Sequence, residues 1–443
     1  MLPKKANVRK RCLCFWRYGS RLREAPCWTV GALNILGATN NMINKRTLAT
    51  AVAASSLALA GMAQAEVKVG FLGGFTGGIE SLTPPIFAGA QLAVAQVNEQ
   101  GGILGGQTLE MPSGDTTCSD ASAASNAADR MVNSEQVTAI VGALCTGATI
   151  AAANNAAIPG GVLMVSPAST APAVSELDDN DLVFRTVPSD AFQGEMLAKL
   201  LLDKGIDFVA VTYVNNDYGR GLSDAFSDAF EAGGGEIAEN LAHEDNRADY
   251  RSELGSLSVS GADTLVVLAY ADTSGQTVLR QAYEGGMFTQ YVGADGMVGD
   301  SLVEAIGADI LDGMIATRPG SPDLPGTDIF TEAAEAADID PSAVFAAQAY
   351  DAAFLVALAI EQNGSAEREG LSEALRSVSS APGEVILPGE WEKAVELIAA
   401  GTEINYEGAS GSHEFDENGD VPGVVVEMVV EDGSFTSKGL VEL

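Results

Sequence analysis

Residues 137–170 decide the fold of this chain, and they read VTAIVGALCTGATIAAANNAAIPGGVLMVSPAST. The apolar, β-branched runs at residues 137–141 and 162–165 predict two buried strands. A turn that contains Thr146 follows the first run, and a turn that contains Thr170 follows the second. Because the carboxyl ends of parallel strands lie on one edge of a sheet, where ligands bind in such folds, we expect both turns at one site.

The hydroxyl groups of these turns, together with the N–H groups that start the following helices, favour an anion such as a carboxylate. The alternative is that Thr146 and Thr170 are ordinary helix caps, a position that hydroxyl residues favour. A single turn of this kind would indicate a cap. Two in succession, the first containing Cys145, favour a binding site.

The charge of the chain is distributed unevenly. Residues 1–65 hold 10 of the 24 Lys and Arg but only one of the 60 Asp and Glu. The remaining residues carry 14 basic and 59 acidic side chains, a formal charge of −45. A surface this acidic repels nucleic acid and anionic membranes. The length of 443 residues allows two or three domains.

Residues 42–65 have the features of a secretory signal peptide. Residues 42–46 are basic, residues 47–61 are apolar but too few to span a bilayer, and an A-x-A cleavage signal ends at Ala65. We therefore expect cleavage after Ala65 and a mature protein that does not insert into the membrane. Residues 1–41 precede a complete signal and are expected to be an over-called N-terminal extension.

Two of the five cysteines, Cys118 and Cys145, lie in the expected mature protein. An even pair in an exported protein suggests a disulfide, and two buried thiols are the alternative. A bridge across these 27 residues would contribute roughly 3.5 kcal/mol to stability in the loop-entropy model. Cys12 and Cys14 suggest a metal-binding leader only weakly, because no histidine supports them.

Strand and helix patterns alternate along the mature chain, which predicts mostly parallel sheets in two similar lobes, each of them discontinuous. A long helix is expected from the Asp340 cap and Pro341 to about residue 362. Residues 383–420 are rich in turn formers, and an apolar run at residues 424–430 predicts a terminal hairpin.

The residues do not require an enzyme. His243 and His413 are far apart in the sequence, and a zinc site would need more His or Cys. A catalytic triad lacks the G-x-S-x-G turn that would support it, and the glycine-rich residues 73–78 lack both the dinucleotide spacing and a P-loop lysine. We therefore expect no catalysis, no cofactor and no metal.

Short motifs spread from residue 67 to the C-terminus resemble those of the periplasmic branched-chain amino acid-binding proteins, the soluble receptors of ABC importers. They include Phe87-x-Gly89-Ala90, Gly101-Gly102-Ile103, Leu144-Cys145-Thr146, Ser166-Pro167-Ala168-Ser169-Thr170, Tyr218-Gly219, Leu279-Arg280-Gln281-Ala282 and Tyr406-Glu407-Gly408-Ala409. Each motif is short, but their order covers nearly the whole mature chain.

The resemblance implies an α/β fold of the type I periplasmic binding protein class. In this class two doubly wound, mostly parallel lobes are joined by three hinge crossings, and the ligand is held in the cleft. Lobe one would comprise residues 66–188 and 320–417, and lobe two residues 189–319 and 418–443. The resemblance also implies a periplasmic, monomeric protein that binds a free amino acid and docks on an inner-membrane ABC permease.

The resemblance assigns roles to residues as well. The lobe-one turns that contain Thr146 and Thr170 would hold the α-carboxylate and amino group of the ligand, and Asp295 in lobe two would meet the ammonium. Leu82 stands where many relatives have an aromatic residue, which leaves the side-chain specificity open. The expected disulfide partners are Cys118 and Cys145. The expected ligand-binding residues are Leu144, Cys145, Thr146, Ala168, Ser169, Thr170, Tyr218, Tyr270, Asp295 and Phe345.

Other functions remain open at this point. Within the same fold, the ligand would be an amide, urea or an aromatic acid rather than a branched-chain or other apolar amino acid. From another class, a secreted α/β hydrolase would need the nucleophile turn that is not found. A sensory ectodomain is the third alternative, but no transmembrane segment follows the lobes.

Overall fold

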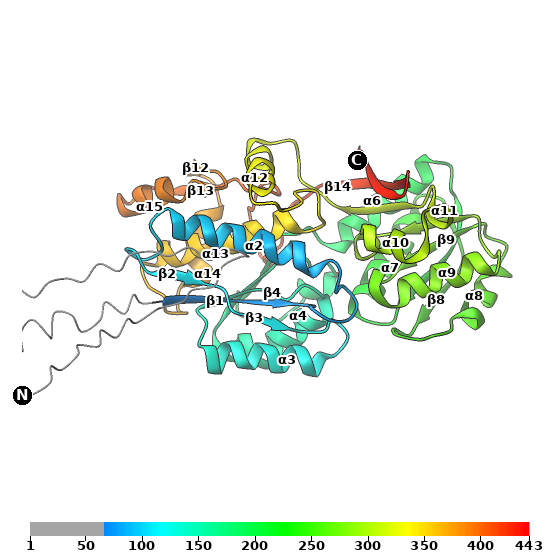
Figure 1. Cartoon of the computed structure of the whole chain (residues 1–443), viewed down its shortest axis with the longest axis horizontal. Coiled ribbons are helices and arrows are strands. Elements are labelled where there is room, and N and C mark those ends of the chain that lie inside the picture. The colour runs from blue at the N-terminus through cyan, green and yellow to red at the C-terminus, as the bar shows by residue number, and fades with distance from the viewer. Residues whose placement is uncertain (1–65, 443) are drawn as a thin grey trace, which may run out of the picture. The chain divides into compact units, whose positions relative to one another are not determined.

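The computed structural model of this chain describes residues 66–442 (Figure 1). The expected signal peptide at residues 42–65, its cleavage after Ala65 and the extension at residues 1–41 lie outside the described residues. Within the described part, no helix has both the length and the apolar character needed to cross a membrane.

The first sheet is parallel and has the strand order β2-β1-β4-β5-β6, with β3 also paired to β1. Figure 1 shows α2 and α13 on one side of this sheet and α3 and α4 on the other, as expected of a doubly wound lobe. Its strands are β1 (Glu66–Gly73), β2 (Thr108–Glu110), β3 (Ser113–Asp115), β4 (Ala139–Gly142), β5 (Leu163–Ser166) and β6 (Val183–Arg185). The helices of this part are α2 (Thr83–Glu99), α3 (Ala121–Asp129), α4 (Thr146–Ala152), α5 (Ile158–Gly160), α13 (Ala346–Asn363), α14 (Leu371–Ser379) and α15 (Trp391–Ala399).

The second sheet has the order β15-β14-β11-β10-β9-β7-β8, and only β14 and β15 run antiparallel to their neighbours. Its strands are β7 (Phe208–Val214), β8 (Glu236–His243), β9 (Thr264–Leu268), β10 (Gln290–Gly293), β11 (Ile315–Pro319), β14 (Val425–Glu431) and β15 (Ser434–Leu440). Its helices are α6 (Asp190–Asp203), α7 (Asp217–Ala232), α8 (Arg251–Ser258), α9 (Gln276–Glu284), α10 (Asp300–Ile306) and α11 (Ala308–Leu311).

The remaining elements are short or lie apart from the two main sheets. Strands β12 (Glu384–Ile386) and β13 (Ile404–Tyr406) form a small parallel sheet, and α12 (Pro325–Ala336) follows β11. The π and 3-10 segments are η1 (Arg130–Glu135), η2 (Ala153–Ala157), η3 (Pro172–Val174), η4 (Ala271–Gly275) and η5 (Asp295–Met297).

The chain passes between the two sheets three times, after β6, after β11 and before β14. The predicted α/β fold with two mostly parallel sheets and three crossings is therefore confirmed, as is the terminal hairpin of β14 and β15. The residue at which each lobe begins and ends stays a prediction. A buried ion pair joins two crossings, because Arg185 Nε donates to Asp420 Oδ1 at 2.6 Å.

One local expectation was wrong. The long helix begins at Ala346 and not near Asp340, because Phe345 has a φ of +63°, outside the helical region, and Asp340 instead caps a turn through the N–H of Ser342. Residues 383–420, which are rich in turn formers, also contain α15, whose Trp391 indole is buried. The sequence also does not predict β8, an edge strand whose side chains are mostly half-buried or exposed.

Candidate functional site

A pocket lies where the carboxyl ends of β4 and β5 in the first sheet face residues that follow β9 and β10 in the second. Eight of the expected ligand-binding residues line it, together with residues that the sequence did not single out. The lining residues are Ile79, Leu82, Ile86, Leu144, Cys145, Thr146, Ala168, Tyr218, Tyr270, Asp295, Gly296 and Phe345.

The turn after β5 takes its shape from hydrogen bonds within the turn and to the neighbouring strand. Ser166 Oγ donates to the carbonyl of Ala143 at 2.5 Å and accepts the N–H of Ser169 at 3.0 Å. Thr146, the first residue of α4, presents its hydroxyl to the pocket and accepts the N–H of Ala171 at 3.4 Å. The two turns that the sequence predicts to share a site are therefore adjacent, with Ala168 in the wall between them.

Ser169 and Thr170 do not line this pocket, although the sequence placed them in the ligand set. Ser169 Oγ bonds Thr149 Oγ1 at 2.6 Å and the carbonyl of Ala143 at 3.2 Å, so its hydroxyl serves the turn itself. Thr170 is fully buried behind the wall, and Arg185 holds its carbonyl at 2.7 Å. Direct ligand binding by either side chain stays a prediction.

Asp295 provides the acidic group on the side of the pocket that the second sheet forms. It lies just beyond β10, is 3% exposed, and accepts hydrogen bonds at Oδ1 from Tyr218 Oη at 3.0 Å and Gln193 Nε2 at 2.9 Å. Burial raises the pKa of Asp295 to about 6, while the hydrogen bonds from Tyr218 and Gln193 lower it. This carboxylate is buried and held in position by two donors. Gln193 lies on α6 in no recognisable motif, and no sequence signal indicates it.

The aromatic rings of Tyr218 and Tyr270 stack beside Asp295, with their centroids 5.0 Å apart and their planes 12° from parallel. Burial, followed by the charge of Asp295, raises the pKa of both phenols well above the usual range. Tyr218 therefore stays protonated and donates to the carboxylate. Gly78, in the loop between β1 and α2, lies against Tyr270. A Cβ at Gly78 would come within 2.9 Å of that ring.

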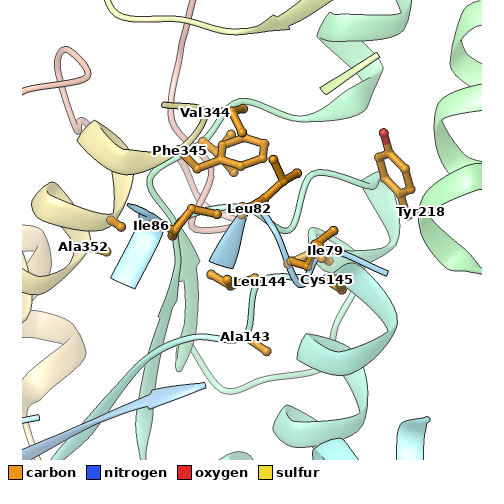
Figure 2. Close-up of a cluster of buried hydrophobic side chains, with 14 of the residues drawn as sticks. Ile79, Leu82, Ile86, Ala143, Leu144, Cys145, Tyr218, Val344, Phe345 and Ala352 are labelled. Atoms are coloured by element: carbon orange, nitrogen blue, oxygen red, sulfur yellow. The ribbon is translucent and has the colours of Figure 1, made fainter. Parts of the chain in front are cut away.

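The rest of the pocket is apolar. Figure 2 shows Ile79, Leu82, Ile86, Leu144 and Phe345 grouped on one side and Tyr218 on the other. Ile79 and Leu82 come from the loop after β1, and Ile86 comes from α2. Such a wall suits an apolar side chain, because burying aliphatic surface is favourable by about 25 cal/mol per Å².

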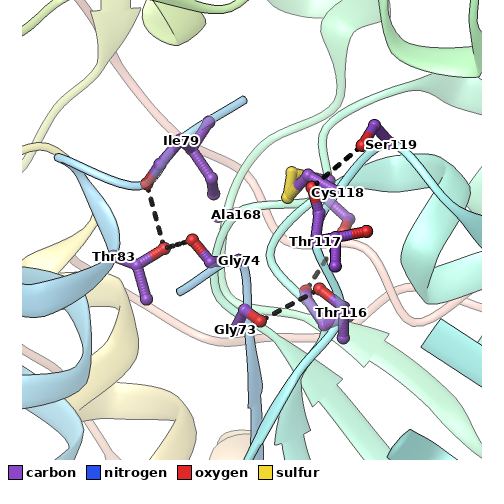
Figure 3. The surroundings of a disulfide bond; sticks show 12 residues. Gly73, Gly74, Ile79, Thr83, Thr116, Thr117, Cys118, Ser119 and Ala168 are labelled. Atoms are coloured by element: carbon purple, nitrogen blue, oxygen red, sulfur yellow. Dashed lines mark hydrogen bonds between the residues drawn. A yellow bond between two sulfur atoms is a disulfide. The ribbon is translucent and has the colours of Figure 1, made fainter. Parts of the chain in front are cut away.

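A disulfide joins Cys118 to Cys145 beside the pocket, with the Cα atoms 5.4 Å apart, which confirms the expected pair. Figure 3 shows it next to the Gly74 loop, where a Cβ at Gly74 would come within 2.7 Å of Cys118 Sγ. Cys145 directly precedes α4, so the bridge ties the segment after β3 to the turn that presents Thr146.

Polar contacts also join the loop between β1 and α2 to residues that follow strands β9 and β10 of the second sheet. The N–H of Ser81 donates to Asp272 Oδ2 at 2.7 Å, and Ser301 Oγ donates to Ser81 Oγ at 2.8 Å. We call this pair of contacts the Ser81 latch. It lies next to Leu82, which lines the pocket.

Metal ions such as zinc are held by clusters of His, Cys and acidic side chains. Among residues 66–442, no three His, Cys, Asp or Glu side chains gather closely enough to hold a metal ion. His243 bonds Thr212 Oγ1 at 2.8 Å, and burial lowers its pKa to about 4. Burial also lowers the pKa of His413, which lies beside Asp351.

The chain is similar to known proteins. A family model described as periplasmic binding protein matches residues 66–393. The leucine-, isoleucine-, valine-, threonine-, and alanine-binding protein of Pseudomonas aeruginosa is 31% identical over 332 residues, which cover 74% of this chain and 87% of that protein.

Solved structures agree. A leucine-binding protein of Thermotoga maritima is 28% identical with a TM-score of 0.72, and the match covers 84% of this chain and 98% of that one. A solute-binding protein of R. palustris in complex with benzoate has a TM-score of 0.69 over 85% of this chain and 96% of its own, and at 18% identity it shows the fold alone. The chain belongs to the periplasmic binding protein family.

Proposed function

We propose that this protein is the substrate-binding component of an ABC importer and that it captures a branched-chain or other apolar amino acid. The observation that carries this proposal is one pocket that combines the buried carboxylate of Asp295, the hydroxyl of Thr146 and an apolar wall. These three features match the ammonium, the carboxylate and the side chain of such a ligand. The names of the relatives from Pseudomonas aeruginosa and Thermotoga maritima support the same ligand class.

The ammonium would pair with Asp295. A charged group that enters a closed pocket loses its water and needs a partner of opposite charge. Asp295 is the acidic residue among those that line the pocket, and Tyr218 and Gln193 keep it oriented.

The carboxylate would lie at the two turns of the first sheet. Thr146 offers a hydroxyl there, and the backbone N–H groups that start α4 have no partner within the helix, as at any helix start. Donors of this kind form strong hydrogen bonds with an ionised acceptor. Ala168 lines the pocket at the second turn and would contact the ligand there, whereas Thr170 would contribute only through the backbone of that turn, because its side chain does not line the pocket.

A thermal-shift screen of free amino acids tests the assignment. A ligand at a hundred times its Kd should add about 2.7 kcal/mol to the free energy of unfolding. Benzoate, 4-hydroxybenzoate, acetamide and urea are the comparison set, because they lack an ammonium. Stabilisation by one of these, with none by leucine, isoleucine or valine, would contradict the proposal.

Thr146→Val should weaken binding of the best amino acid by about 1.5 to 3 kcal/mol, since it removes a hydrogen bond to a charged group and keeps the shape. Isothermal titration calorimetry measures the change, and Thr146→Ser, which keeps the hydroxyl, is the matched control. The melting temperature without ligand should hardly move in either variant. Equal affinity of Thr146→Val and the parent would mean that Thr146 is only a helix start.

The affinity should fall as the solution is made acidic through about pH 6. The pKa of Asp295 is raised to about 6 by burial, and only the ionised form pairs with an ammonium. Below that pH the free protein must release a proton to bind, so the Kd should rise about tenfold per pH unit. Titrations between pH 8 and pH 5 test this, with Asp295→Asn as the variant that loses the dependence. A Kd that is unchanged at pH 5 would contradict the role of Asp295.

The cellular setting follows from the family. We infer that residues 42–65 are removed by cleavage after Ala65, so that the mature protein begins at Glu66, the first residue of β1. The mature receptor would work in the periplasm as a monomer, without catalysis, and dock on an inner-membrane permease. Lobe one would comprise residues 66–188 and 320–417, and lobe two residues 189–319 and 418–443.

A further inference from the structure

Four buried side chains gather behind the ligand pocket, where the chain passes between the sheets. We call them the hinge cluster, and all four are 0% exposed. Thr170 belongs to the turn after β5, Asp190 and Gln193 to the first turns of α6, and Thr317 to β11 just before the second crossing. None of the four lines the ligand pocket.

Contacts show that the cluster is contiguous. The N–H of Asp190 donates to the carbonyl of Thr170 at 2.7 Å. Gln193, one helical turn beyond Asp190, donates from Nε2 to the carbonyl of Thr317 at 3.3 Å and to Asp295 Oδ1 at 2.9 Å. The cluster therefore links the turn after β5, both neighbouring crossings and the rear of the Asp295 carboxylate.

By distance and angle, the side-chain oxygens of this cluster have no hydrogen-bond partner within residues 66–442, namely both Asp190 carboxylate oxygens, Thr170 Oγ1, Gln193 Oε1 and Thr317 Oγ1. The Thr170 hydroxyl is nevertheless near enough to Asp190 to lower the pKa of its carboxyl group. A buried polar atom without a partner costs about 1 to 3 kcal/mol, and a charged one costs more, so native structures rarely leave such groups together. The carboxylate and the amide oxygen can only accept, and they need a donor or a cation.

The surroundings do not provide a cation for Asp190 from the protein itself. The nearest guanidinium, that of Arg185, is occupied by Asp420 and by the carbonyls of residues 169–171. Burial raises the pKa of Asp190 and the charge of Asp295 raises it further, while Thr170 and Arg185 lower it. The start of α6 also favours the ionised form, because anions are stabilised at a helix N-terminus.

From this geometry we propose that Asp190, Thr170, Gln193 and Thr317 bind a small monovalent cation, with Na⁺ as the ion to test. Hard cations take oxygen ligands, and this set offers one carboxylate and three neutral oxygens. A single negative charge matches a monovalent ion, since Asp295 Oδ1 is already bonded to Tyr218 and Gln193. The bound ion would offset the repulsion between Asp190 and Asp295 and fasten the crossings together.

The unliganded mature protein provides the test, so the outcome does not depend on which amino acid binds. Melting temperatures are measured with EDTA in NaCl and in choline chloride at equal concentration, which keeps charge screening the same. We expect the melting temperature to be at least 2 °C higher in NaCl and the difference to saturate as the Na⁺ concentration increases. Equal melting temperatures in the two salts would overturn the proposal and assign a proton or a water to the cluster.

Variants show whether a Na⁺ effect on the melting temperature comes from the hinge cluster or from the acidic surface of the protein. Asp190→Asn should lose the difference between NaCl and choline chloride, and in choline chloride it should melt no lower than the parent because a buried charge is gone. Asp203→Asn changes an exposed residue at the other end of α6 and should keep the full difference. Thr317→Val, which removes one neutral oxygen, should require more Na⁺ for the same shift. A full Na⁺ effect in Asp190→Asn would place the ion elsewhere and overturn the site.

Discussion

Asp295→Ala should raise the Kd for the best amino acid by about 30-fold to several thousand-fold. The variant leaves the ligand's ammonium buried without its charged partner, and losing one member of a buried, hydrogen-bonded charge pair costs roughly 2 to 5 kcal/mol. Asp295 meets these conditions, because it is 3% exposed and held by Tyr218 and Gln193. Isothermal titration calorimetry measures the loss.

Asp309→Ala is the matched control for this experiment. Asp309 is exposed on α11, in the same part of the chain, and should bind ligand like the parent. The melting temperature of Asp295→Ala without ligand should stay close to that of the parent or rise, since a buried charge is removed. If Asp295→Ala bound the amino acid as tightly as the parent, ligands without an ammonium would become the better assignment.

Loss of the Cys118–Cys145 bridge should lower the free energy of unfolding by roughly 3.5 kcal/mol. The bridge closes a loop of 27 residues, and the loop-entropy model gives this value for the constraint on the unfolded chain. Chemical denaturation of the oxidised protein and of Cys118→Ala/Cys145→Ala measures the difference. A second effect is expected at the pocket, because Cys145 precedes Thr146 and the bridge orders this turn.

Thiol labelling provides the control for the bridge. Denatured but unreduced mature protein should react at no cysteine, and after reduction it should react at two. A double variant as stable as the parent would mean that packing around Gly74 already holds the segment after β3 in place.

The fold was predictable because its signals are local and repeated. The runs at residues 137–141 and 162–165 are apolar and β-branched, and they became β4 and β5 with helices between them. The place of Thr146 just beyond a strand end was predictable for the same reason, whereas the role of Asp295 came from the resemblance to periplasmic amino acid-binding proteins. A strand end in a parallel sheet places the next residues at the ligand edge.

Other parts of the site depend on contacts that no local pattern indicates. Ile79 and Ile86 look like ordinary core residues, and only the packing of the first loop against the second sheet's side puts them in the pocket wall. Gln193 lies on α6, on a face of the helix that shows neither a clearly polar nor a clearly apolar pattern in the sequence. The hydroxyl of Ser169 bonds Thr149, a contact that no local pattern indicates, and its direct contact with the ligand stays a prediction.

Residues at special backbone positions were hard to predict as well. The Asp340 cap is real, but it caps a turn, and the positive φ of Phe345 delays the helix to Ala346. A sequence pattern favours a helix that starts at the first residue suited to a cap. It does not indicate which of two possible start positions is selected by tertiary packing.

The Ser81 latch raises the share of empty receptors that are closed like a loaded one. Its two hydrogen bonds, at about 1 kcal/mol each, favour closure by a factor of about 30, which leaves most of the closing free energy to the ligand. In the proposed importer, a receptor that closed without cargo would engage the permease and deliver nothing. A stronger latch would tighten ligand binding by depopulating the open state, and it would increase idle docking to the same degree. On this reasoning, the modest strength of these two contacts would keep idle docking low.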